Sequence, residues 1–123
     1  MVIDTSVFIE FLRKKDKTNT ILYSISEVNP LAISSVTLYE LLMGATDSQK
    51  LHDIQLLTED LLILPFDDRV AAKSGEIYHQ LKKENKMIEF RDIFIAATCI
   101  IYQMPLKTLN TKHFERISGI TIL

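Results

Sequence analysis

Three carboxylates of this chain stand alone in apolar or small-residue stretches, where a fold normally places its core. Asp4 follows the apolar start of the chain, and Asp92 precedes a long apolar run. Glu40 is the only charged residue between Glu27 and Asp47. An unpaired carboxylate in such surroundings costs on the order of several kcal/mol, which is comparable to the whole stability of a small domain. Each of the three therefore needs a helix cap, an ion pair or a metal ion.

Helix capping is a structural alternative for each acid taken singly. Asp4 could cap the helix that follows it, and Glu40 could complete a capping box by reaching back to the amide of Thr37. Asp92 in a first helical turn is favoured by the helix dipole, and Asn110 could cap a short helix behind it. Singly, these readings remain open beside a functional one.

The elements that must position these residues alternate along the chain. Apolar runs bounded by polar turns predict short buried strands, and segments with helical period lie between them. The strands are 1–3, 31–33, 61–64, 106–109 and 120–122; the helices are 6–15, 18–28, 37–45, 49–59, 69–85, 91–103 and 112–117. Ser35 or Thr37 and Asp67 or Asp68 serve as start signals, with Gly44 and Pro105 near helix ends. The order predicts an α/β fold, with a short, mostly parallel central sheet between two layers of helices.

That architecture brings the separated polar residues to one edge of the sheet. Open parallel sheets bind ligands beyond the carboxyl ends of their strands, where Asp4 and Asn110 lie directly and Glu40 lies in the next helix. Asp92 starts a helix that can point at the same edge. Carboxylates gathered there repel one another unless a divalent cation neutralises them, and hard cations prefer oxygen ligands. We therefore expect a Mg²⁺ or Mn²⁺ site.

Composition limits the remaining classes of function. The 123 residues predict one domain, 1–123, and the net charge of −2 argues against a protein that grips nucleic acid through bulk positive charge. The single Cys99 lies in an apolar run and predicts a buried thiol, while no stretch reaches the ~20 apolar residues of a membrane span. We expect a cytoplasmic protein that does not enter membranes.

Histidines and basic residues play smaller parts in the prediction. The three histidines lack metal-site spacing, and surface or packing roles are expected for His52, His79 and His113. Local basic groups could hold a polynucleotide backbone beside the acidic cleft, and Arg13, Arg91 and Lys112 are the candidates nearest the acidic elements in the sequence.

Four segments carry a resemblance to a known family. They are Val2-Ile3-Asp4-Thr5-Ser6-Val7, then 33–45 with Glu40, Asp92-Ile93-Phe94-Ile95-Ala96-Ala97-Thr98, and 106–114 with Asn110. In this order and spacing the chain resembles the PIN-domain ribonucleases, specifically the VapC-type toxins of toxin–antitoxin pairs. The resemblance implies a PIN-like fold, RNA as substrate, a small antitoxin protein as partner and a homodimer.

The resemblance also implies roles for individual residues. Asp4, Glu40 and Asp92 match the acids that bind Mg²⁺ or Mn²⁺ in metal-assisted hydrolysis of phosphodiester bonds, and Asn110 stands at the fourth catalytic corner. Many relatives have an acid at that place or three residues on, where this chain has His113. The pocket is lined by Ser6 and Thr108, with Glu89 as an additional carboxylate.

Two other functions remain open on the sequence. A phosphatase of the haloacid-dehalogenase type also begins with an apolar strand and an Asp, but it needs a second Asp where this chain has Ser6. A catalytically weak or inactive PIN-like interaction module is the second alternative, because Asn110 is neutral. Metal titration and a small aryl phosphate substrate distinguish these readings from a ribonuclease.

Overall fold

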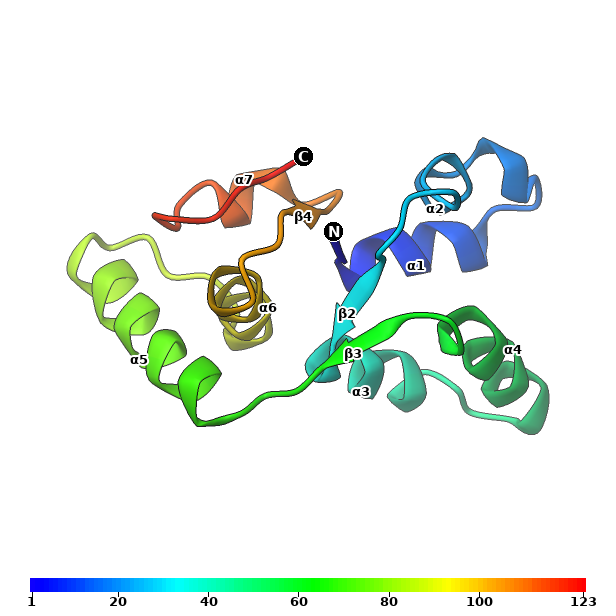
Figure 1. Cartoon of the computed structure of the whole chain (residues 1–123), viewed down its shortest axis with the longest axis horizontal. Helices are drawn as coiled ribbons and strands as arrows, with labels where there is room; N and C mark the ends of the chain where they lie inside the picture. Colours follow the sequence, from blue (N-terminus) through cyan, green and yellow to red (C-terminus); the bar gives the residue numbers. More distant parts are fainter.

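The computed structural model describes all residues from Met1 to Leu123 and alternates short strands with helices (Figure 1). The longest helix, α5, has 16 residues, and no helix combines the length and apolarity needed to cross a bilayer. In chain order the elements are β1 (Val2–Ile3), α1 (Thr5–Arg13), the 3₁₀ turn η1 (Lys17–Asn19), α2 (Ile21–Ser24), β2 (Ala32–Ser34), α3 (Ser35–Met43), α4 (Ser48–Thr58), β3 (Leu62–Leu64), α5 (Asp68–Lys83), α6 (Phe90–Ile101), β4 (Leu106–Lys107) and α7 (Thr111–Phe114).

The four strands form one parallel sheet in the order β3-β2-β1-β4. Val2 of the central strand β1 pairs with Ala32 on one side and with Leu106 on the other. All carboxyl ends therefore lie at the same edge of the sheet. The predicted α/β class with a short parallel sheet is confirmed.

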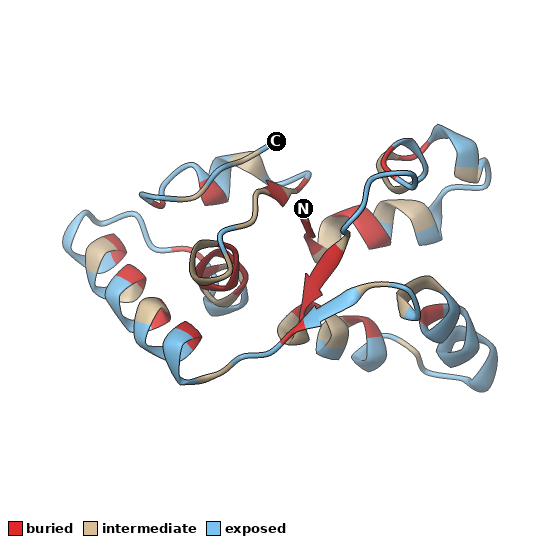
Figure 2. Ribbon diagram, viewed as in Figure 1, coloured by how far each residue is buried: buried red, intermediate tan, exposed pale blue.

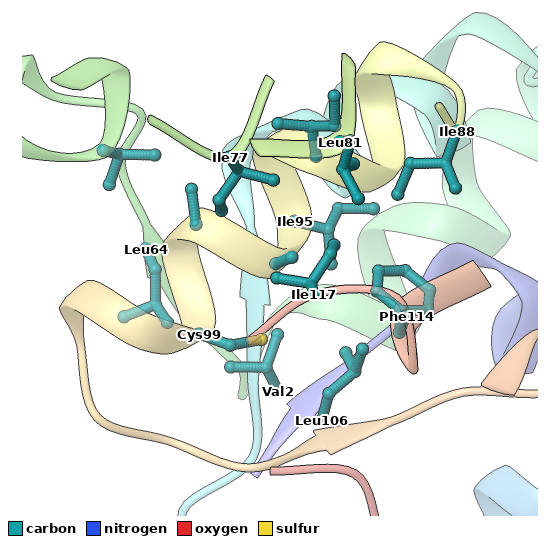
Figure 3. Close-up of a cluster of buried hydrophobic side chains, with 14 of the residues drawn as sticks. Val2, Leu64, Ile77, Leu81, Ile88, Ile95, Cys99, Leu106, Phe114 and Ile117 are labelled. Carbon is teal, nitrogen blue, oxygen red and sulfur yellow. The ribbon is translucent and has the colours of Figure 1, made fainter. Parts of the chain in front are cut away.

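Consecutive strand residues face opposite sides of the sheet, and this alternation creates two hydrophobic clusters. Val2 and Ala32 belong to a larger cluster with α5, α6 and α7 (Figure 3). Ile3 and Ile33 belong to a smaller cluster with α1, α2, α3 and α4. Figure 2 shows the buried strand β2 between these two groups of helices, with the edge strand β3 largely exposed. The sheet is thus the middle of three layers.

Cys99 lies in α6 inside the larger cluster and is only 2% exposed. Burial raises the pKa of its thiol to about 12, because the thiolate would lose its hydration. The prediction of a small buried hydrophobe is confirmed.

Two predicted elements differ from the structure. The helix expected over 18–28 is divided, because the side chain of Asp16 caps η1 and the hydroxyl of Thr20 then starts the short α2. The strand expected over 120–122 forms only an isolated bridge between Ile122 and Leu106. That segment runs parallel to the edge strand β4 and pairs with it at one residue only, so it does not form a fifth strand.

Helix starts and ends agree with sequence signals except at α3. Asp67 caps α5 and Gly44 is the C-cap of α3, as predicted. The N-cap of α3 is Ser34, whose hydroxyl accepts the amide of Thr37, so Ser35 and Thr37 as caps are wrong. Ser34 is also the last residue of β2. Because the strand runs directly into the helix, no loop in the sequence marks the cap.

Candidate active site

Asp4 lies at the junction of β1 and α1 and is only 2% exposed. Although it occupies the N-cap position of α1, its side chain makes no capping hydrogen bond. Its Oδ2 atom instead accepts hydrogen bonds from the hydroxyls of Ser6 and Thr108, each at 2.7 Å. The capping alternative for Asp4 is therefore wrong. Two donors satisfy one oxygen of a buried carboxylate and fix its orientation.

Both hydroxyls are themselves held in place by backbone amides. Ser6 Oγ accepts the amide of Leu109 at 3.1 Å, and Thr108 Oγ1 accepts the amide of Asn110 at 2.9 Å. Because each hydroxyl oxygen accepts a hydrogen bond from an amide, its own proton is free to be donated to Asp4. The structure thus brings the predicted pocket residues Ser6 and Thr108 to Asp4, through the turn that follows β4.

Asp92 lies in the first turn of α6 and contacts a histidine. Its Oδ2 is 3.0 Å from Nδ1 of His113 in α7, and its side chain is 17% exposed. Burial raises the pKa of Asp92, and the nearby charge of Asp4 raises it further, while the hydrogen bond with His113 opposes both. His113 is exposed, as expected, and its ring in addition contacts Asp92. Its position three residues after Asn110 was the available signal.

Glu40 projects from the middle of α3, where it does not cap a helix. Its Oε1 accepts the hydroxyl of Thr5 at 2.9 Å, and its Oε2 binds Nη1 of Arg91 at 2.9 Å. The side chain is 12% exposed. The capping-box alternative is wrong, because Ser34 satisfies the amide of Thr37. Glu40 instead connects α3 to α1 and α6.

Arg91 binds a second carboxylate as well. Its Nη2 donates to Oε2 of Glu89 at 2.7 Å, and this hydrogen bond lowers the pKa of Glu89. The Glu89 side chain is 66% exposed. Both residues are therefore engaged with each other at the rim of the site: Arg91 is held by two carboxylates, and Glu89 faces Arg91 and solvent.

The remaining predicted residues lie farther out. Asn110 occupies the N-cap position of α7 and is exposed, with no capping hydrogen bond from its side chain. Lys112 is exposed on α7. Arg13 lies in the last turn of α1 and lines a cleft of about 600 Å³ between α1, α3 and α4, which Glu40 borders from the other end.

The acids fit a hard cation in charge and donor type, although they do not form a complete ligand set. No group of three or more His, Cys, Asp or Glu side chains is placed to hold a metal ion. Oδ1 of Asp4 and Oδ1 of Asp92 make no hydrogen bond. Every fully buried side-chain oxygen of the structure has a hydrogen-bond partner, so these two atoms must be accessible to solvent. Neither carboxylate has a Lys or Arg within ion-pair distance. Carboxylate oxygens that no Lys or Arg neutralises suit Mg²⁺ or Mn²⁺.

Known proteins are similar to this chain in sequence. Residues 1–120 match the PIN domain family. Ribonuclease VapC1 of Methanocaldococcus jannaschii is 32% identical over 95% of this chain and 80% of its own length. Ribonuclease VapC of Rickettsia bellii is 34% identical over 100% of this chain and 94% of its own length.

Solved structures with the same fold come from toxin–antitoxin complexes. The DNA-bound VapBC of Salmonella typhimurium matches with a TM-score of 0.87 and 28% identity over 99% of this chain and 95% of that one. VapBC-1 of nontypeable Haemophilus influenzae matches with a TM-score of 0.85 and 29% identity over 99% and 95% of the two chains. The family match covers residues 1–120 and the structural matches cover 99% of this chain. The chain belongs to the PIN domain family.

Proposed function

We propose that this chain is a Mg²⁺- or Mn²⁺-dependent endoribonuclease that hydrolyses RNA phosphodiester bonds as the toxin of a toxin–antitoxin pair. The observation that carries the proposal is the pair formed by Asp4 and Asp92, two largely buried acids at the carboxyl edge of the sheet, neither of which pairs with a Lys or Arg. The relatives named ribonuclease VapC support the substrate and the reaction. The solved VapBC complexes support an antitoxin protein as partner.

Each residue near the acids has a defined task in this proposal. Ser6 and Thr108 hold Oδ2 of Asp4, which leaves Oδ1 directed to the site. His113 orients Asp92 in the same way from α7. A cation bound by these two acids would lower the pKa of a water molecule and neutralise charge on the scissile phosphate. Glu40, held by Thr5 and Arg91, would bind the metal through water or orient the nucleophile.

The test is cleavage of RNA by the purified chain with Mg²⁺, Mn²⁺ or EDTA. Asp4→Asn and Asp92→Asn keep the size of each side chain and remove its charge, so we expect a folded protein with at least about a 100-fold loss of cleavage. Asp60→Asn is the matched control, because the side chain of Asp60 is exposed and forms no hydrogen bond or ion pair. Metal-dependent cleavage that persists in both site variants would overturn the proposal.

Two further measurements separate the alternatives. An intact fold without Mn²⁺ binding in calorimetry would assign the chain to the inactive interaction modules. Hydrolysis of a small aryl phosphate without RNA cleavage would assign it to the phosphatases. Light scattering tests the proposed homodimer, and co-purification with the product of a neighbouring gene tests the antitoxin.

A further inference from the structure

A groove without any apolar lining residue lies beside the acidic site. It encloses about 480 Å³ between the end of α5 and α7. Its walls carry three cationic side chains and one acidic one, in a chain whose net charge is −2: Asn85, Lys86, Lys112, Glu115 and Arg116 line it. The groove is therefore a local concentration of positive charge on a protein that is acidic as a whole.

The backbone around this groove is well defined by hydrogen bonds. Helix α5 ends in a Schellman turn, in which Asn85 adopts a left-handed φ of 55° and the amide of Lys86 donates to the carbonyl of Leu81 at 2.9 Å. Arg116, which follows α7, donates to the carbonyl of Met87 at 3.1 Å and to that of Lys86 at 3.4 Å. These contacts join the two walls, which lie next to each other in Figure 1.

No carboxylate of the protein forms an ion pair with the cations of the groove. The ion pairs of the structure involve Lys14, Lys50, Arg69, Lys73, Arg91 and His113. None involves Lys86, Lys112 or Arg116, and all three side chains are exposed. An anionic ligand could therefore bind them without first breaking a salt bridge.

The position of the groove suggests which anion it holds. Lys112 is adjacent in sequence to His113, whose ring contacts Asp92. A polynucleotide with one phosphate at the two acids would therefore pass along α7. Repeated phosphates match repeated unpaired cations, and such contacts fix the register of a nucleic acid without reading its bases.

We propose that Lys86, Lys112 and Arg116 form a phosphate-binding subsite that holds the RNA backbone beside the scissile bond. This inference rests on the proposed ribonuclease function and adds the path of the substrate to it. The polar lining favours a phosphate backbone over a stacked base, since no aromatic side chain lines the groove.

Binding of a single-stranded RNA to the cleavage-deficient Asp4→Asn protein tests the subsite. Addition of Lys86→Ala and Lys112→Ala should weaken binding by about tenfold at moderate salt and reduce the slope of log K against log salt by about 1.4, for two phosphate contacts. The same two charges removed by Lys15→Ala and Lys73→Ala, just after α1 and on the first half of α5, form the control. Lys15 is exposed and makes no ion pair, and Lys73 pairs only with the exposed Glu76.

The readouts distinguish failure of this inference from failure of the proposed function. In the active protein, the groove variant should cleave long RNA more weakly than the control variant does. Equal affinity and equal salt slope in groove and control variants would overturn the subsite even when cleavage is intact. Weaker binding of an acidic peptide with unchanged RNA binding would also overturn it, in favour of a protein partner. Absence of cleavage in wild type would overturn the nuclease alone, because the binding measurement does not depend on turnover.

If the alanine variant does not fold, Lys86→Gln and Lys112→Gln are used instead, because glutamine keeps part of the aliphatic stem and removes the charge. Lys86→Arg and Lys112→Arg retain the charge and should restore both affinity and salt slope. A loss that the arginine variants do not restore would contradict a phosphate contact.

Discussion

The hydroxyl of Thr108 donates a 2.7 Å hydrogen bond to Oδ2 of Asp4, 104 positions away in the chain. This bond crosses from the end of β4 to the end of β1, the central strand of the sheet. Because Asp4 has no basic partner, the two hydroxyls around it supply its protein hydrogen bonds. The same contact therefore positions Asp4 in the candidate site and joins the ends of β4 and β1.

Thr108→Val removes that donor with little change in shape. We expect the free energy of unfolding to fall by about 1–3 kcal/mol, because a buried carboxylate loses one of its two donors. RNA cleavage should fall as well, since Asp4 is then free to rotate. Urea denaturation and a cleavage assay measure the two effects. Thr121→Val, at an exposed position, should change stability by less than about 0.5 kcal/mol, and an equal loss there would contradict this role of Thr108.

Arg91 holds Glu40 by a 2.9 Å ion pair. Arg91→Gln frees an oxygen of Glu40 and removes a positive charge near the acids, so Mn²⁺ should bind roughly threefold to tenfold more tightly in calorimetry. Arg69→Gln removes a guanidinium that pairs with Asp67 and is the matched control, for which unchanged affinity is expected. Weaker Mn²⁺ binding by the Arg91 variant would show that the ion pair positions Glu40 for the metal.

The pKa of Asp92 is raised, chiefly by burial. A raised pKa means that the folded state binds a proton more readily than the unfolded state, so ionisation of Asp92 lowers stability as the pH rises through the unfolded and then the folded pKa. Without metal at neutral pH, Asp92→Asn should therefore unfold at a higher urea concentration than wild type. The difference should disappear in acid, where Asp92 is protonated in both states.

The Asp60→Asn variant provides the control for that measurement, because its carboxylate is exposed. A lower stability of Asp92→Asn at neutral pH would mean that the hydrogen bond with His113 outweighs burial. Addition of Mn²⁺ should then raise the stability of wild type more than that of Asp92→Asn, since binding to the folded state alone stabilises it.

The thiol of Cys99 has a pKa raised to about 12 by burial. Because the thiolate is the nucleophile, native protein at pH 8 should react with an aromatic disulfide reagent at least about 100-fold more slowly than unfolded protein. Absorbance of the released thiol measures both rates, and unfolding in guanidinium supplies the fully reactive control. Rapid labelling of folded protein would contradict the packing of α6.

The fold could be predicted from the sequence because each strand is a short apolar run and the helices between them have clear periods. Burial dictates where such runs lie, as the alternation of Val2 and Ile3 between the two clusters shows. Short elements without a repeated period were less predictable. The divided helix at Thr20 and the single bridge at Ile122 depend on one cap and one pairing.

The positions of Asp4 and Asn110 after parallel strands could be predicted from the sequence, whereas Thr108 lay inside the strand expected over 106–109 and was indicated only by the family resemblance. The contacts of Glu40 with Arg91 and of Asp92 with His113 could not be predicted. They depend on how α6 and α7 are rotated against the sheet. Helical periodicity defines the buried face of a helix but not which exposed residues meet across two helices.

The place of β1 in the sheet has a consequence for how the protein can move. Its amides are held by neighbouring strands on both sides, and its two residues belong to different hydrophobic clusters. Hydrogen exchange at β1 should therefore require global unfolding. The backbone that carries Asp4 is therefore rigid. In the proposed function, the long basic side chains around it are the groups that change conformation to fit different RNA molecules.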